Sequence, residues 1–304
     1  MRADMGHRGH RDMGHRGHRG HRDMGHRNEH AVSGTHGFAA QPAERRPDRA
    51  VLRNLRRQVD ALGGCGARHG TVALGIAEID RHLPWGGLPR GCLHEILGDK
   101  ADGAPLAFAA HLLALLSARH AGPVLWLSAR DGLYPPGLHA FGPAGAWTAR
   151  LLAVCARIPG RPISEQRGAG HRNLIWALEE ALRTRGPAAV AAEVGQLDLV
   201  AARRLQLAAE EGGALALVLR EAAKDGAGQA RTTAVTRWHV RSAPSTSCAW
   251  GGPGAVRWRI ELLRCRGGAP RGWTVERDDE TGTFAVVAAL RDGPRRAHAA
   301  ALAG

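Results

Sequence analysis

Apolar runs that alternate with amphipathic segments are the feature that most constrains the fold of this chain. The clearest runs are GPVLWLSARD (122–131), AAVAAEV (188–194) and ALALVLRE (214–221). None of them alternates with polar residues, which is typical of strands buried on both faces. Between them, leucines at every fourth position predict a helix over 171–185, and Asp198 begins a second one over 199–211. This order predicts an α/β fold with a mostly parallel sheet flanked by helices.

The carboxyl-terminal part has a different texture, with short alternating segments separated by turn residues. These segments are TTAVTRWHVRSA (232–243), AVRWRIELLRCR (255–266), GWTVERDD (272–279) and GTFAVVAAL (282–290). We expect them to form antiparallel strands, so residues 71–290 are predicted to be one core with a β-rich end. A basic, alanine-rich flexible tail at 291–304 follows.

The amino-terminal part is predicted to be a disordered tail and linker over residues 1–47. Its first 30 residues repeat DMGHRGHR in varied form and offer no apolar face. In one interpretation the histidines of this repeat bind a metal ion opportunistically. In the other, the repeat arose by slippage in the DNA and is translated upstream of the physiological start. The candidate start residues are Met1, Met13 and Met24. An apolar stripe that includes Val51, Leu55 and Val59 then predicts a helix over 48–70.

The charge and the cysteine content of the chain indicate its binding partners and its cellular compartment. Lys plus Arg outnumber Asp plus Glu by 42 to 28, giving +14, and Lys100 and Lys224 are the only lysines. A basic surface favours polyanions, nucleic acid first, although a GC-rich coding sequence also explains many arginines. The five cysteines lack metal-ligand or redox-motif spacing, and no apolar stretch is long enough to cross a bilayer. We therefore expect a cytoplasmic protein with unpaired thiols and no metal.

A glycine loop between a predicted strand (92–97) and a predicted helix (105–120) has the outline of a phosphate-binding loop. It consists of Gly98, Asp99, Lys100, Ala101, Asp102, Gly103, Ala104 and Pro105. A working loop of this kind needs a lysine for the β- and γ-phosphates, then a hydroxyl for magnesium. Ala104 and Pro105 supply neither, and the two aspartates repel a triphosphate. Each missing charge-assisted hydrogen bond weakens binding by about 1.5–3 kcal/mol, so the sequence predicts a degenerate loop that binds no nucleotide cofactor.

Residues 74–98 (LGIAEIDRHLPWGGLPRGCLHEILG) resemble the entry to the core of RecA-type ATPases. Four segments carry a closer resemblance: LPWGGLPRG (83–91), GPVLW (122–126), LDLVAARRLQLAAE (197–210) and RWRIELLRCRGG (257–268). With these segments the chain resembles the ImuA family, RecA-like accessory proteins of bacterial mutagenic translesion synthesis. The resemblance covers about residues 50–290 and implies a RecA-like core of the phosphate-loop type.

The resemblance also bears on catalysis. RecA-type ATPases carry a glutamate as general base where this chain has Arg130, with Asp131 beside it, and an arginine accepts no proton from water. By analogy, Glu193 lies near the position at which RecA-type ATPases carry a carboxylate that organises magnesium. Alternatively, it is only a polar residue at a strand end. These losses predict a protein that is not an enzyme. The alternative is a divergent, DNA-dependent ATPase that uses Lys100.

For function, the resemblance implies a non-catalytic scaffold in SOS-induced mutagenic DNA repair. The implied partners are an ImuB-like relative of Y-family polymerases, an error-prone replicative-type polymerase and RecA, with nucleoid association when the protein is engaged on DNA. A second alternative is an SOS cell-division inhibitor of the SulA type.

Single-stranded DNA is a further partner suggested by the resemblance. The stretch 224–232 matches a DNA-holding loop of RecA, so the residues expected to contact DNA are Lys224, Arg231, Arg237 and Trp238. In the competing interpretation, the tryptophan belongs to the protein core.

Overall fold

The computed structural model describes residues 51, 68–99, 101–129, 133–156, 163–222, 231–247, 250–252, 254–278 and 280–290. The expected tails (1–47 and 291–304) lie outside these residues, as does the helix expected at 48–70 except for Val51 and residues 68–70. Lys100, Arg130, Asp131 and Lys224 are also outside the described residues.

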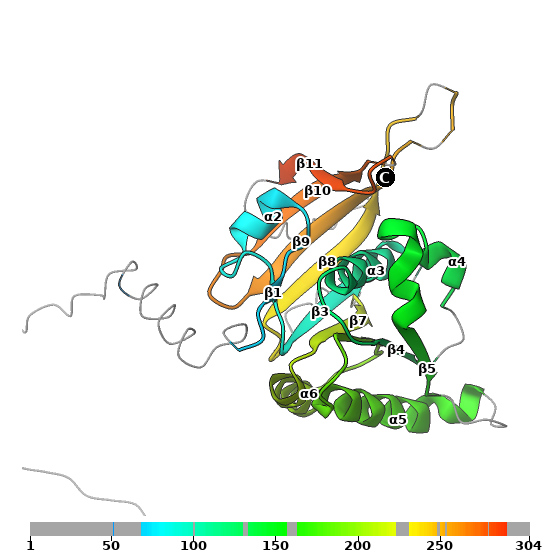
Figure 1. Cartoon of the computed structure of the whole chain (residues 1–304), viewed down its shortest axis with the longest axis vertical. Helices are drawn as coiled ribbons and strands as arrows, with labels where there is room; N and C mark the ends of the chain where they lie inside the picture. Colours follow the sequence, from blue (N-terminus) through cyan, green and yellow to red (C-terminus); the bar gives the residue numbers. More distant parts are fainter. Residues whose placement is uncertain are drawn as a thin grey trace, which may run out of the picture. The chain divides into compact units, whose positions relative to one another are not determined.

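A nine-stranded sheet in the order β11-β10-β9-β8-β3-β7-β6-β4-β5 forms the centre of the described fold (Figure 1). Its strands are β3 (Cys92–Gly98), β4 (Val124–Ser128), β5 (Leu151–Cys155), β6 (Ala189–Glu193), β7 (Leu215–Glu221), β8 (Thr236–Ala243), β9 (Arg257–Cys265), β10 (Arg271–Arg277) and β11 (Phe284–Leu290). Strands β3 to β8 pair in parallel, and β9, β10 and β11 continue the sheet antiparallel. The predicted mostly parallel sheet is confirmed.

Strand β8 joins the two parts of the sheet. It pairs antiparallel with β9, as predicted, but on its other side it pairs in parallel with β3, with His94 opposite Thr236, which we did not predict. Side-chain alternation cannot distinguish these cases, because it reports which face is buried and not the direction of the neighbouring strand. The β-rich end therefore shares one continuous sheet with the parallel part.

Helices cover the two faces of the parallel part. Helix α3 (Ala104–Ser117) packs on one face, and α5 (Ile163–Arg183) and α6 (Leu199–Gly212) pack on the other (Figure 1). The remaining elements are β1 (Thr71–Val72), α2 (Ala77–His82), β2 (Leu88–Pro89), α4 (Pro135–Leu138) and the 3-10 helix η1 (Pro143–Arg150). No described helix combines the length and apolarity needed to span a membrane.

Helix α6 illustrates how sequence signals fix the ends of an element. The Asp198 carboxylate accepts a hydrogen bond of 2.7 Å from the Ala201 N–H, and Gly213 ends the helix in the left-handed conformation at φ 82°. An N-cap of this kind contributes about 1 kcal/mol, and glycine adopts a positive φ without steric cost. Both ends agree with the predicted range to within one residue.

An apolar layer covers one face of the whole sheet, and a second layer covers the other face of its parallel part. The layer beside α3 contains the tryptophans Trp126, Trp238, Trp258 and Trp273. The layer under α5 and α6 contains Leu174, Leu178 and Leu182, the leucines that predicted α5. The cysteine prediction holds only in part: Cys155 and Cys265 are free, whereas the buried Cys92 is disulfide-bonded, so the expectation of unpaired thiols is wrong at this position.

Candidate functional site

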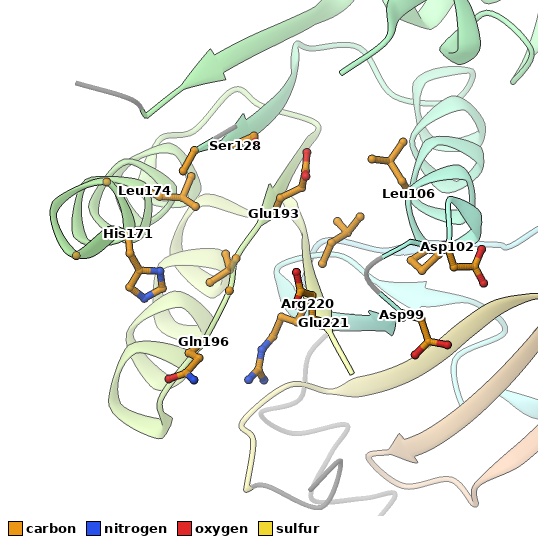
Figure 2. Close-up of a pocket in the computed structure, with 18 residues that line it drawn as sticks. Asp99, Asp102, Leu106, Ser128, His171, Leu174, Glu193, Gln196, Arg220 and Glu221 are labelled. Carbon is orange, nitrogen blue, oxygen red and sulfur yellow. The ribbon is translucent and has the colours of Figure 1, made fainter. Parts of the chain in front are cut away.

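A cavity of about 930 Å³ opens at the carboxyl ends of the parallel strands. The ends of four strands line it: Gly98 of β3, Ser128 of β4, Glu193 of β6 and Glu221 of β7. Figure 2 shows Asp102 and Leu106 on the side of α3, with His171 and Leu174 of α5 across the opening. Open α/β sheets bind ligands at the carboxyl ends of their strands, where the connecting helices diverge to opposite faces. The volume of the cavity suits a small molecule.

The glycine loop lies at this cavity, between β3 and α3 as predicted. Strand β3 ends at Gly98 and α3 begins at Ala104, with Pro105 in its first turn. A Cβ atom built on Gly98 would lie 1.9 Å from Cγ of Pro105 and 3.0 Å from the Val240 carbonyl oxygen. The proline ring therefore closes over Gly98, and only glycine fits at the end of the strand.

Replacing Gly98 with alanine is expected to destabilise the protein by about 1–3 kcal/mol, because the loop must shift to admit the new methyl group. Urea denaturation followed by circular dichroism measures this change. Gly103→Ala is the matched control: its φ is −77°, and nothing lies within 4 Å of the added atom. This variant should be neutral or more stable by up to about 1 kcal/mol. Equal stability of both variants would contradict the close packing of Pro105 on Gly98.

The Asp102 carboxylate lies at the amino end of α3, where a helix favours negative charge. Its carboxylate accepts a hydrogen bond of 2.9 Å from the Ala104 N–H at the start of α3, and two of 2.7 Å from the N–H and hydroxyl of Ser242. The Asp102 N–H itself donates to the Asp99 carbonyl oxygen. Burial raises the pKa of Asp102, but the bonds from Ala104 and Ser242 outweigh it and lower the pKa overall. The loop thus uses its own carboxylate to satisfy the amino end of the helix.

The charges that line the cavity are mainly negative. Among the described lining residues there are four carboxylates, from Asp99, Asp102, Glu193 and Glu221, and one guanidinium, from Arg220. The Glu193 carboxylate is fixed by a hydrogen bond of 2.9 Å from the indole N–H of Trp126. An excess of carboxylates repels a polyphosphate, which carries charge of the same sign.

A buried ion cluster lies beside the cavity, centred on Glu95 of β3. Glu95 is 1% exposed; it accepts bonds of 2.6 Å from the Arg237 guanidinium and the Thr232 hydroxyl, and Arg220 lies 3.7 Å away. Burial lowers the pKa of Arg220, an effect that Glu95 partly offsets. Arg220 therefore links the cluster to the cavity wall (Figure 2).

The structure separates the four residues expected to contact DNA. Arg237 is 4% exposed and held by Glu95, and Trp238 is 0% exposed in the core. Their side chains are therefore not available to DNA in this conformation, and we correct the expectation for both. Arg231 is exposed, so its contact with DNA stays a prediction. Lys224 lies outside the described residues.

Sequence reasoning missed Glu95 and Arg220. A signal for Glu95 is present in CLHEILG (92–98), where a glutamate interrupts an otherwise apolar strand. A carboxylate in a strand buried on both faces requires a cationic partner. The partner itself is not predictable, because Arg237 and Arg220 follow more than 120 residues later in the sequence. Among the described residues, no group of three or more His, Cys, Asp or Glu side chains is placed to hold a metal ion.

Comparison with known proteins gives the chain a family. No family model matches it. Protein ImuA of Caulobacter vibrioides, from strain NA1000 / CB15N and again from a second strain, is 39% identical over 245 residues, which cover 75% of this chain and 93% of the relative. The aligned region spans nearly the whole length of that protein. The chain therefore belongs to the ImuA family.

Proposed function

We propose that this protein is a non-catalytic, RecA-like scaffold of SOS-induced mutagenic translesion DNA synthesis. It links an ImuB-type relative of Y-family polymerases, an error-prone replicative-type polymerase and RecA at damaged DNA. The family membership supports this role in DNA repair. The strand-loop-helix arrangement that follows β3, an interior strand of the parallel part of the sheet, supports the RecA-like core.

One observation carries the non-catalytic part: the Asp102 carboxylate satisfies the start of α3 and ties the loop to Ser242. A triphosphate would have to displace this carboxylate without help from a lysine at position 104 or a hydroxyl at position 105. It would also have to enter a cavity lined by three further carboxylates.

The purified chain is expected to show no saturable ATP binding below about 1 mM and no ATP turnover, with or without single-stranded DNA. Two missing charge-assisted hydrogen bonds weaken binding by about 3–6 kcal/mol, or a factor of about 10² to 10⁴. Isothermal titration calorimetry and a phosphate-release assay measure this, with RecA as the positive control. Micromolar binding that is abolished by Lys100→Ala would instead support the divergent ATPase.

The scaffold role is tested by co-expression with an ImuB-type polymerase relative, the error-prone polymerase and RecA, followed by affinity purification. We expect a complex that forms equally with and without ATP. Assembly only in the presence of ATP would contradict a scaffold with a closed loop. Recovery of the tubulin-like division protein, without any of the three partners, would favour an inhibitor of the SulA type.

A further inference from the structure

An arginine-rich face lies on the β-rich end of the sheet, on the side away from α3. Trp238 and Val240 of β8 and Trp258 and Ile260 of β9 point to the apolar layer beside α3, so the alternate residues of both strands point the other way. We call this opposite side the arginine face; its charged side chains are Arg241, Arg257, Arg259, Glu261, Arg264 and Glu276. Among the described residues no helix packs on it, and Arg241, Arg257 and Arg259 are 39%, 24% and 31% exposed in their side chains.

The pairing of strands places like charges side by side on this face. Arg241 lies directly opposite Arg259 across β8 and β9, an arrangement that disfavours the sheet because like charges face each other. Glu261 lies between them and contacts both guanidinium groups, at 3.8 and 2.7 Å. Four arginines against two glutamates leave the arginine face with excess positive charge. An anionic partner would remove the repulsion that remains.

The arginine face is also hollowed. A depression of about 460 Å³ is lined by Arg241, Arg257 and Arg259, together with Thr274 of β10 and Pro244 at the start of the loop that joins β8 to β9. Arg257 is paired with Glu276, and Arg241 and Arg259 share Glu261. Three guanidinium groups around two carboxylates at one concave place keep donors for phosphate groups, which arginine binds through paired N–H groups.

An exposed tryptophan lies in the same hairpin. Trp250, in the loop between β8 and β9, is 94% exposed, which is rare for so large an apolar side chain. The loop that carries Trp250 begins at Pro244, which lines the depression. An exposed aromatic side chain together with a basic groove is the combination by which proteins bind single strands, since every base offers a flat face for stacking. In a duplex the bases are already stacked and paired, so this tryptophan favours a single strand.

We propose that the arginine face binds single-stranded DNA, with Arg241, Arg257 and Arg259 on the phosphates and Trp250 stacked on a base. This inference rests on the proposed function for the presence of DNA, and it differs from the predicted contact at residues 224–232. The depression shares no described lining residue with the cavity at the ends of β3, β4, β6 and β7, although Ser242 at its rim bonds Asp102 of that cavity.

The test uses the full chain and a fluorescein-labelled oligo-dT, with binding followed by anisotropy over a range of salt concentrations. The triple variant Arg241→Gln/Arg257→Gln/Arg259→Gln is expected to bind the oligonucleotide about 100-fold more weakly than the wild type does. The plot of log K against log salt has a negative slope, and its magnitude should decrease by about 2 in this variant, since each single-strand phosphate contact contributes about 0.7. Trp250→Ala should weaken binding about tenfold and leave the slope unchanged.

The matched control is Arg172→Gln/Arg185→Gln/Arg203→Gln, which removes the same charge from exposed positions on and beside α5 and α6. It should bind oligo-dT within about threefold of the wild type. Equal loss in both triple variants, or no loss with the arginine-face variant, would overturn the proposal. A chain that recovers its polymerase partners but binds no oligo-dT would overturn this inference alone. Loss of those partners in the arginine-face variant, with DNA binding intact, would assign the face to an acidic protein instead.

Discussion

Replacing Glu95 with alanine is expected to lower the free energy of unfolding by about 3–5 kcal/mol, a large part of the stability of an ordinary domain. Glu95 is 1% exposed and the Arg237 guanidinium lies 2.6 Å from its carboxylate. Removal of the carboxylate leaves the Arg237 charge buried without its nearest counter-ion, and the Thr232 hydroxyl without its acceptor. Urea denaturation of the purified variant, followed by circular dichroism, measures the loss.

Two further variants separate this effect from general damage. The double variant Glu95→Leu/Arg237→Leu removes both charges, so it is expected to cost less than Glu95→Ala alone. Glu78→Ala removes a carboxylate from an exposed pair with Arg81, at 3.8 Å, and should change stability by less than about 1 kcal/mol. If Glu95→Ala costs no more than Glu78→Ala, the cluster does not hold its buried charges as the structure indicates.

The parallel sheet was predictable because its signal is local. Apolar runs such as 188–194 and 214–221 must be strands covered on both faces, and Asp198 and Gly213 mark the ends of α6 within one turn of the chain. Even the phosphate-type loop is a local pattern. For this reason its position between β3 and α3 was predictable within a residue or two.

The site itself was less predictable, since its contacts join distant parts of the sequence. Asp102 was expected to repel a triphosphate, but its bonds to Ser242, 140 residues away, show that it also closes the loop. Trp238 and Arg237 were assigned to DNA because arginine beside tryptophan is typical of single-strand binding. In a strand, however, neighbouring residues point to opposite faces, and here both faces are buried. The pairing of Arg241 with Arg259 depends on strand register, which the sequence alone does not show.

The second large effect is a loss of stability in mild acid, caused by His94. The imidazole is fully buried in β3, where the Thr236 hydroxyl donates to Nδ1 at 2.8 Å and Nε2 donates to the Pro89 carbonyl oxygen at 2.9 Å. The Thr236 oxygen in turn accepts from the indole N–H of Trp238. Every polar atom of the neutral ring therefore has a partner, and a proton on Nδ1 would turn the Thr236 hydroxyl away.

Burial lowers the pKa of His94 from 6.5 to about 4, although the Pro89 carbonyl partly offsets this. Between these two values the unfolded chain binds a proton that the folded protein does not, so stability falls as the pH falls. The full difference corresponds to about 3 kcal/mol, present above pH 6.5 and lost by about pH 4. Urea denaturation at pH 7.5, 6, 5 and 4 measures this slope.

His94→Gln tests whether this residue is the cause. The variant is expected to be less stable than the wild type at pH 7.5, because the glutamine does not reproduce both hydrogen bonds of the ring. Its stability should change less between pH 6.5 and 4. A smaller slope remains because burial also lowers the pKa values of His111 and His120. His139→Gln, at an exposed position, should retain the full slope. If His94→Gln and the wild type lose stability in parallel as the pH falls, the acid sensitivity arises elsewhere in the protein.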